Sequence, residues 1–406
     1  MTLSTRARWG LVSTTGVLTG FGHGFAAFAV SALLKPMALD LDTGRGAIST
    51  AIGLGRFVAG IASPTIGRIT DAYGTRLMVI AGMVVSAIGL FLLAGIRTEA
   101  ELYLVWSLVF SVGIAAGFTV ALDKLVVATA AEKGGMALAV RFSVSAVVAT
   151  LIVPLVTAMI EHVGWRQTCV IWGAIILLLI PVPYFFFGMK PAYPDATSLG
   201  QARPLKDTAA GRPVLRQKAF WIIAAALTAQ ASVTTGLSVH LVPLMTDFGL
   251  DAVFAAMLFG GMVLLTVPVR LLAGYIADHV PPSKLPAVLG TLLVLEGLAI
   301  GSFALAPSFA TMLVVIGALG VAAGAPMVLV LILCAELFGR SGFATVQGNL
   351  MMVQVPGTML APIVAGYVHD FTGSYVPVVA AFCALLVLGG AGLGLLKAQG
   401  RRDAAL

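Results

Sequence analysis

The feature that most constrains this chain is a succession of long apolar segments. Twelve stretches can be laid along its 406 residues, and each has the ~20 mainly apolar residues needed to cross a ~30 Å hydrocarbon core. Charged residues make up 10% of the chain, whereas soluble proteins carry about 25%. Backbone groups in hydrocarbon need partners within their own segment, and the short alternating stretches of a membrane barrel are absent, so the segments should be helical. The sequence predicts an all-α integral membrane protein, with spans at 9–34, 47–68, 77–96, 101–129, 137–161, 165–188, 219–246, 251–277, 285–306, 308–337, 344–368 and 374–397.

Lysine and arginine are distributed unevenly between the two sets of loops. If both termini are cytoplasmic, the opposite side keeps four basic residues, Lys35, Arg45, Arg97 and Arg166. Loops rich in lysine and arginine stay in the cytoplasm. We therefore expect a multi-pass protein of the cell (inner) membrane with cytoplasmic termini. The same asymmetry accounts for most of the net charge of +7, so nucleic acid is not an expected partner.

The stretch 189–217 has almost no apolar periodicity and is rich in proline, glycine and charge, which is typical of a flexible connector. It separates an N-terminal bundle, 1–188, from a C-terminal bundle, 218–406. We expect each bundle to contain six helices, with the connector in the cytoplasm.

The two halves share motifs at a constant spacing. Gly67-x-x-x-Asp71 recurs 207 positions later as Gly274-x-x-x-Asp278. Two parallel six-helix repeats are the architecture of a large class of transporters, in which substrate binds near the bilayer midplane between the repeats. The offset therefore identifies residues that should occupy equivalent walls of the two bundles.

The loop from Gly67 through Asp71 and Gly74 to Arg76 reads Gly-Arg-Ile-Thr-Asp-Ala-Tyr-Gly-Thr-Arg. It resembles the G-x-x-x-D-x-x-G-x-R loop signature of the major facilitator superfamily. The resemblance covers the whole chain and implies twelve transmembrane helices in two pseudo-symmetric six-helix bundles. It also implies that Asp71 and Arg76 latch neighbouring helices at the cytoplasmic end, where the copy at Gly274 and Asp278 is expected to lie as well.

Within this superfamily, the chain looks like the bacterial monocarboxylate and oxalate:formate porter-like branch. Relatives of this type carry a substrate-binding arginine at the position of Arg270. The resemblance rests on five stretches, namely Leu34-Lys35-Pro36 with Gly44-Arg45-Gly46-Ala-Ile-Ser49, His240-Leu-Val-Pro243, Glu336-Leu-Phe-Gly339, Asp370-x-Thr-Gly373-Ser-Tyr375 and Arg270-x-x-x-Gly274-x-x-x-Asp278.

Ionisable residues inside the expected spans are the main functional candidates, since each costs about 2.5–3.5 kcal/mol at a helix centre. They are Arg56, Asp123, Lys124, Arg141, Arg270 and Glu296. A surplus of cations predicts an interior that attracts an anion. Arg270 is the first candidate for the substrate contact, because a guanidinium binds a carboxylate through two parallel hydrogen bonds. Arg56 lies seven residues before Ser63, the repeat equivalent of Arg270, and should face the same wall. A structural ion pair is the alternative for both arginines.

Asp123 and Arg141 lie at similar depth on adjacent spans, so an ion pair is the expected relation. A proton-carrying role for Asp123 is the alternative. Lys124 lies on a different face of its helix and could reach the polar boundary. For Glu296 we expect a structural partner or a protonated carboxyl.

Four uncharged or weakly charged side chains complete the candidates. His23 and Gln230 are equivalent by the repeat and suit a cavity wall, although core hydrogen bonds would explain them equally well. His240 could close an external gate, bind substrate or pack a helix end. Gln354 could orient a solute or bond to a neighbouring helix.

No nucleotide-binding loop, His-Glu-x-x-His motif, paired-cysteine motif or nucleophile elbow occurs, so we expect no enzyme, cofactor or metal site. The predicted function is secondary active transport of a small organic anion, a mono- or dicarboxylate, by alternating access. Protons or an exchanged solute should supply the coupling, and we expect the chain to work as a monomer in the bilayer. The alternatives are a proton-coupled exporter of drugs or amphiphiles from the same superfamily and, less favoured, an intramembrane enzyme.

Overall fold

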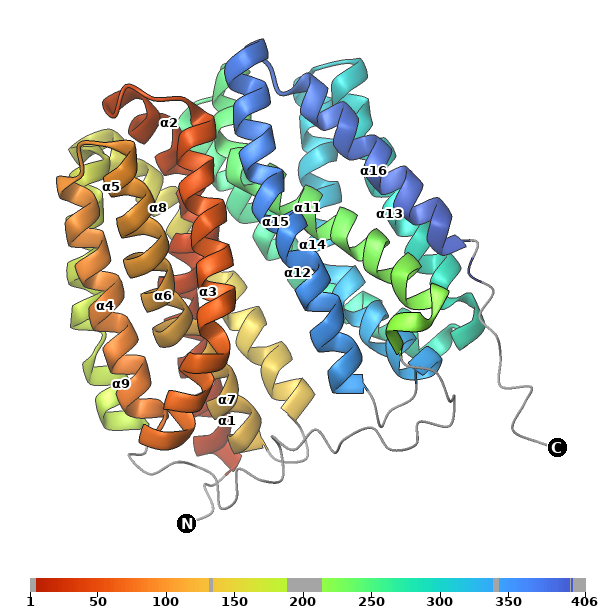
Figure 1. Cartoon of the computed structure of the whole chain (residues 1–406), viewed down its shortest axis with the longest axis horizontal. Helices are drawn as coiled ribbons and strands as arrows, with labels where there is room; N and C mark the ends of the chain where they lie inside the picture. Colours follow the sequence, from red (N-terminus) through yellow and green to blue (C-terminus); the bar gives the residue numbers. More distant parts are fainter. Residues whose placement is uncertain (1–4, 131–133, 188–213, 339–342, 395, 397–406) are drawn as a thin grey trace. The chain divides into compact units, whose positions relative to one another are not determined.

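The computed structural model describes residues 5–130, 134–187, 214–338, 343–394 and 396, and within these ranges every regular element is helical (Figure 1). In this part of the chain, eleven helical segments are long and apolar enough to cross a bilayer, and one of them, Ala137–Phe186, has 50 residues. That segment contains two of the expected spans. The predicted all-α membrane fold is therefore confirmed.

The first four crossings contain three π-helical turns. The first crossing consists of α1 (Thr5–Gly24), η1 (Phe25–Ala29) and α2 (Val30–Asp40). The next two crossings are α3 (Arg45–Tyr73) and α4 (Thr75–Gly95). The fourth crossing runs through α5 (Glu99–Leu104), η2 (Val105–Phe110), α6 (Ser111–Ile114), η3 (Ala115–Val120) and α7 (Ala121–Ala130).

The fifth and sixth expected spans form one helical run, α8 (Gly134–Leu178), which is followed by α9 (Pro181–Phe186). The run turns at Gly164, whose φ of 80° and ψ of 162° lie outside the helical region. Glycine adopts such a φ without steric cost. Beside the turn, Arg166 donates to Asp40 Oδ2 (2.9 Å) and to the carbonyl of Ile96 (2.7 Å) at the end of α4. Arg166 thus connects the turn in α8 to α2 and to the end of α4.

The second half contains two short 3-10 turns, η5 (Val214–Arg216) and η6 (Pro282–Lys284), the latter just before α13 (Leu285–Leu305). Its other long helices are α11 (Lys218–Asp247), α12 (Ala252–His279), α14 (Phe309–Phe338), α15 (Phe343–Thr372) and α16 (Val376–Gly394).

Residue contacts group the chain into two compact units. The first comprises Met1–Ala196 and Ser238–Gly261, and the second comprises Thr197–Leu237 and Met262–Leu406. The first unit thus includes the end of α11 and the start of α12. The bundle ranges 1–188 and 218–406 stay a prediction, and most of the expected connector 189–217 lies outside the described residues.

The core of the first unit contains three fully buried aromatic rings. Phe25 of η1 stacks on Trp172 with ring centroids 5.3 Å apart and meets Phe110 edge-on at 6.1 Å. The Trp172 indole donates to the carbonyl of Phe21 (3.2 Å), just before the turn where the helical hydrogen-bond ladder changes register. Trp172 therefore contacts the π-helical turn twice, through its stacking on Phe25 and through its hydrogen bond to Phe21.

Glycines bring α4 into backbone contact with the fourth crossing. A Cβ added at Gly113 would lie 2.5 Å from the backbone nitrogen of Ser86, and one added at Gly117 would lie 2.8 Å from that of Met83. Small residues allow helices in membranes to approach this closely. Any larger side chain would force the two backbones apart.

We expect Gly113→Ala to lower the free energy of unfolding by about 1–3 kcal/mol through this overpacking. The matched control is Gly261→Ala on α12, where an added Cβ meets nothing within 4 Å. Thermal denaturation of the purified proteins in detergent measures both. Equal melting temperatures for the two variants would contradict the close packing at Gly113.

Candidate functional site

The first unit encloses a cavity of about 280 Å³, named here the His23–Arg56 cavity. Its polar lining comes from α1, α3 and the fourth crossing and comprises His23, Arg56, Ser63, Ser111 and Thr119. Each of the three π-helical turns also contributes to it, through Ala26 and Ala27 of η1, Trp106 and Phe110 of η2, and Ala115 and Thr119 of η3. Such turns are frequent at functional sites, because the extra residue re-aims the side chains around it.

Arg56 is the charged residue of this lining. Among the described residues, no carboxylate or carbonyl lies within bonding distance of its guanidinium. His23 meets Phe28 edge-on, with ring centroids 6.5 Å apart. The cavity wall therefore presents a positive charge that no described group neutralises.

The second unit contains a cavity of about 350 Å³ between α11, α14 and α15, named here the Gln230–Gln354 cavity. Gln230 Nε2 donates to the carbonyl of Ala322 (2.9 Å) and to Thr234 Oγ1 (3.0 Å). Pro326 has no N–H, so the Ala322 carbonyl, four residues earlier on α14, lacks its normal helical donor. The Gln230 amide thus satisfies the carbonyl that the proline leaves open.

The two cavities are lined by equivalent residues of the repeat. Each of four residues in the first cavity has a counterpart 207 positions later in the second, and the pairs are His23 and Gln230, Ala27 and Thr234, Ala115 and Ala322, and Thr119 and Pro326. The offset read from loop motifs therefore also relates the cavity walls. Ser63 lines the first cavity, and its counterpart at this offset is Arg270.

Arg270 lies on the buried face of α12. Thr266 and Ala273, about one turn to either side, are 4% and 2% exposed, whereas Leu272 on the opposite face is 57% exposed. The Nε and Nη1 atoms of Arg270 are buried and have no hydrogen-bond partner among the described residues. The described linings of the two cavities do not include Arg270. Its unpartnered donors are nevertheless costly, and a carboxylate would satisfy them.

The structure brings Asp123 and Arg141 together in an ion pair. Arg141 is completely buried and also donates to Thr19 Oγ1 (2.7 Å) and to the carbonyl of Phe118 (3.0 Å). This cation therefore joins α1, α8 and the fourth crossing. The proton-carrying alternative for Asp123 stays a prediction.

Lys124, the next residue, faces the loop motif instead. Its Nζ donates to the carbonyl of Gly67 (2.7 Å) and to both carboxylate oxygens of Asp71 (2.7 and 2.8 Å). The sequence analysis missed this pairing. The signal for it was the rotation of roughly 100° that separates successive residues such as Asp123 and Lys124 on a helix.

The rest of the loop motif also holds neighbouring helices. Gly74 separates α3 from α4 with a φ of 91°, a conformation that favours glycine. The Arg76 guanidinium lies 4.0 Å above the ring of Tyr184 on α9. In the second copy, an added Cβ at Gly274 would meet nothing within 4 Å, and the side chain of Asp278 lies outside the described part of the chain.

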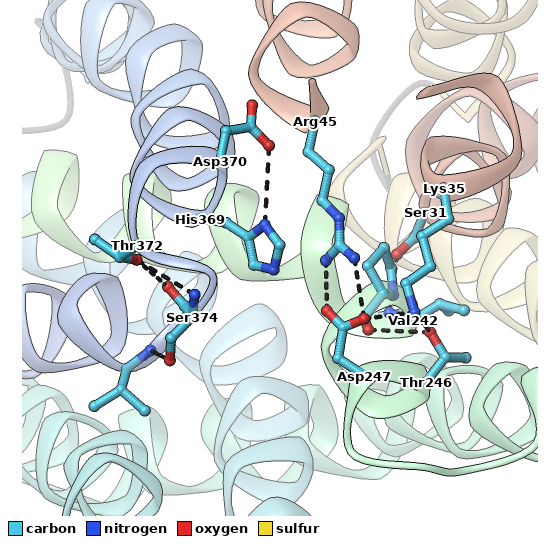
Figure 2. Close-up of polar contacts among 12 residues, drawn as sticks. Ser31, Lys35, Arg45, Val242, Thr246, Asp247, His369, Asp370, Thr372 and Ser374 are labelled. Atoms are coloured by element: carbon cyan, nitrogen blue, oxygen red, sulfur yellow. Dashed lines mark hydrogen bonds and ion pairs between the residues drawn. The ribbon is translucent and has the colours of Figure 1, made fainter. Parts of the chain in front are cut away.

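A polar network joins the α2–α3 end of the first unit to the end of α11 (Figure 2). Asp247 accepts from Arg45 Nη1 (2.5 Å) and Nη2 (3.0 Å), and it pairs with Lys35 Nζ (2.6 Å). We name these three residues the Asp247 latch. Nothing in the sequence singled out Asp247, which follows directly after the expected span 219–246.

Two further hydrogen bonds accompany the Asp247 latch. His240 is 1% exposed, and its Nε2 lies 3.1 Å from Ser49 Oγ on α3. Ser31 Oγ accepts from the backbone nitrogen of Val242 (3.0 Å). His240 therefore contributes to this helix contact and lines neither described cavity.

Helices that can cross a bilayer, an internal repeat and equivalent polar cavities define a two-repeat membrane transporter. The sequence matches the profile of the Major Facilitator Superfamily over residues 16–295, and the chain belongs to this superfamily.

Relatives and solved structures agree with this assignment. The chain is 28% identical to monocarboxylate transporter 11 of Mus musculus, with 86% of this chain and 81% of the relative covered. It is 25% identical to monocarboxylate transporter 13 of Rattus norvegicus (89% and 80% covered) and 24% identical to the uncharacterized transporter YycB of Bacillus subtilis strain 168 (88% and 85%).

The fold is similar to that of a bacterial homologue of the human lysosomal transporter Spinster, with a TM-score of 0.74 and 16% identity over 97% of both chains. It is also similar to the nucleoside transporter NupG, with a TM-score of 0.76 and 13% identity over 95% and 98% of the chains.

The bond between Gln230 and Ala322 can be tested with a double-mutant cycle. Gln230→Leu should lower the free energy of unfolding by about 1 kcal/mol, because it leaves the Ala322 carbonyl without a donor. In a Pro326→Ala background the residue-326 N–H is restored, so Gln230→Leu should then cost less. Thermal denaturation of the four proteins measures the coupling. Additive effects would show that Gln230 does not replace the missing backbone donor.

Proposed function

We propose that this protein is a secondary active transporter that moves a small organic anion, a mono- or dicarboxylate, across the cytoplasmic membrane by alternating access. The observation that carries the proposal is the pair of buried donor atoms on Arg270 that have no partner among the described residues. A bound carboxylate would give the guanidinium an acceptor, and the neutral complex would be better suited to a low-dielectric interior than the free cation.

The balance of charges within the spans supports an anionic substrate. Asp123 neutralises Arg141, and Asp71 neutralises Lys124, so the structural ion pairs use both of these cations. Arg56 and Arg270 remain without an acidic partner among the described side chains. Two positive charges of this kind are unusual in a membrane interior unless a ligand meets them.

The relatives support the same substrate class. Two of the mammalian proteins are named monocarboxylate transporters and match more than four fifths of this chain. A monocarboxylate carries one carboxylate group, which a single arginine such as Arg270 could bind. We also propose His23, Gln230 and Gln354 as substrate contacts, since each of these side chains lines one of the two cavities.

Alternating access also needs contacts that form and break at each end of the molecule. We assign the Asp247 latch, with His240, to the external gate, and the Asp71–Lys124 pair to the cytoplasmic end. With this assignment we propose that the protein lies in the inner membrane with both termini in the cytoplasm. Coupling to protons or to exchange follows from energetics, because an anion entering against a negative-inside potential requires about 2.3 kcal/mol per charge per 100 mV.

Arg270→Gln should abolish or strongly impair carboxylate transport in proteoliposomes. Loss of a charge-assisted contact costs about 1.5–3 kcal/mol, which corresponds to an increase in Kd of about tenfold or more. Uptake of labelled mono- and dicarboxylates, with and without a pH gradient, measures the effect. Arg97→Gln is the matched control, since Arg97 is exposed at the end of α4 and should be dispensable. Wild-type transport by Arg270→Gln would rule out the proposed contact.

A panel of ligands distinguishes the anion carrier from an exporter of drugs or amphiphiles. A carboxylate present at 100 times its Kd should add about 2.7 kcal/mol to the apparent stability of the protein. The melting temperature of the purified protein with each carboxylate and each uncharged drug measures this gain. Stronger stabilisation by the uncharged drugs than by any carboxylate would favour the exporter.

A further inference from the structure

Glu296 is a buried acid that the proposed substrate site does not use. It lies in the middle of α13 and is 6% exposed, and its Oε1 has no hydrogen-bond partner among the described residues. Its side chain lines a cavity of about 360 Å³ between α13 and α14, named here the Glu296 cavity. The other lining residues are all apolar, among them Leu292, Ala299, Val314 and Val321.

The described surroundings of Glu296 offer no cation to neutralise a carboxylate. The described titratable groups on the two long helices packed against α13 are the thiols of Cys334 on α14 and Cys383 on α16. Lys284 of η6 precedes Glu296 by 12 residues, which is roughly 18 Å along a helix. An ionised carboxylate is costly in such a place, whereas a protonated one is neutral and can donate a hydrogen bond. The ligand that this site accommodates most easily is a proton.

The Glu296 cavity adjoins the Gln230–Gln354 cavity across a single helix. Ala322 and Pro326 of α14 line both cavities. Helix α14 is weak at this level, because Pro326 removes one backbone hydrogen bond and the wall beside it is built of small residues. The residues Gly317, Ala318, Ala322 and Ala325 leave little side-chain volume between Glu296 and the other cavity.

We propose that Glu296 is the proton-binding residue of the transport cycle and that protons reach it from the Gln230–Gln354 cavity past Pro326. The carboxylate accepts a proton from a hydronium ion in the cavity water and later returns it to water, with no other bond formed or broken. Protonation removes the uncompensated charge from the apolar cavity and so changes the relative stability of the states of the cycle. This inference rests on the proposed function, because it requires a proton-coupled carrier.

The test compares two transport modes of the same reconstituted protein. Glu296→Gln mimics the protonated acid, so it should retain exchange of labelled for unlabelled carboxylate and lose accumulation driven by a pH gradient. Glu161→Gln is the matched control, because Glu161 is exposed on α8 and should leave both modes unchanged. Accumulation by Glu296→Gln at the wild-type level overturns the inference while leaving the proposed function intact.

The remaining outcomes are also decisive. If wild-type protein exchanges carboxylates but shows no response to a pH gradient, proton coupling fails and the inference fails with it, whereas the anion-carrier proposal survives. If Glu296→Gln loses both modes at an unchanged melting temperature, its role is not confined to coupling and the inference is wrong.

If the variant is unstable, infrared difference spectra of wild-type protein with ¹³C-labelled glutamate decide the question. A pH-dependent band of a protonated glutamate that Glu296→Asp abolishes supports the inference, and the absence of such a band overturns it.

Discussion

Hydrocarbon offers a peptide group no hydrogen-bond partner, and the details of this structure follow from that shortage. At two places where a helix departs from the regular ladder, a side chain from another helix donates to a carbonyl. Gln230 donates a hydrogen bond to the Ala322 carbonyl, which Pro326 leaves without a donor, and Trp172 donates to the Phe21 carbonyl before η1. The π-helical turns and Pro326 also line the cavities. A π-helical turn or a proline interrupts the regular hydrogen bonding of a helix, which leaves space and polar atoms inside the bundle.

The repeat allows the two cavities to be compared position by position. Equivalent places hold His23 and Gln230, or Thr119 and Pro326, so the walls share their geometry and differ in their chemistry. The cations break the symmetry further, since Arg270 corresponds to Ser63. The repeat thus gives two cavities lined at equivalent positions, and substitutions within each copy give their walls different chemistry.

The sequence alone was sufficient for the parts of the structure that depend on local pattern. Hydropathy identified the spans, the offset of 207 related His23 to Gln230, and equal depth on adjacent helices brought Asp123 and Arg141 into consideration as a pair. The contacts of Lys124 with Asp71 and of Arg45 with Asp247 join residues 53 and 202 positions apart. They depend on how each helix is rotated about its axis, which hydropathy does not encode. The expected boundary between the spans 137–161 and 165–188 falls where the chain turns, at Gly164.

The Asp247 latch contains two cations and one carboxylate, so it keeps an excess positive charge while it is closed. Its members are partly exposed, with Lys35 at 29% and Asp247 at 33%. Exposed ion pairs contribute about 0–1 kcal/mol each and weaken as dissolved ions screen them over a Debye length of about 8 Å at physiological ionic strength. Dissolved salt at that face therefore competes directly with the closed arrangement. The proposed external gate should therefore open more readily as the ionic strength of the medium rises.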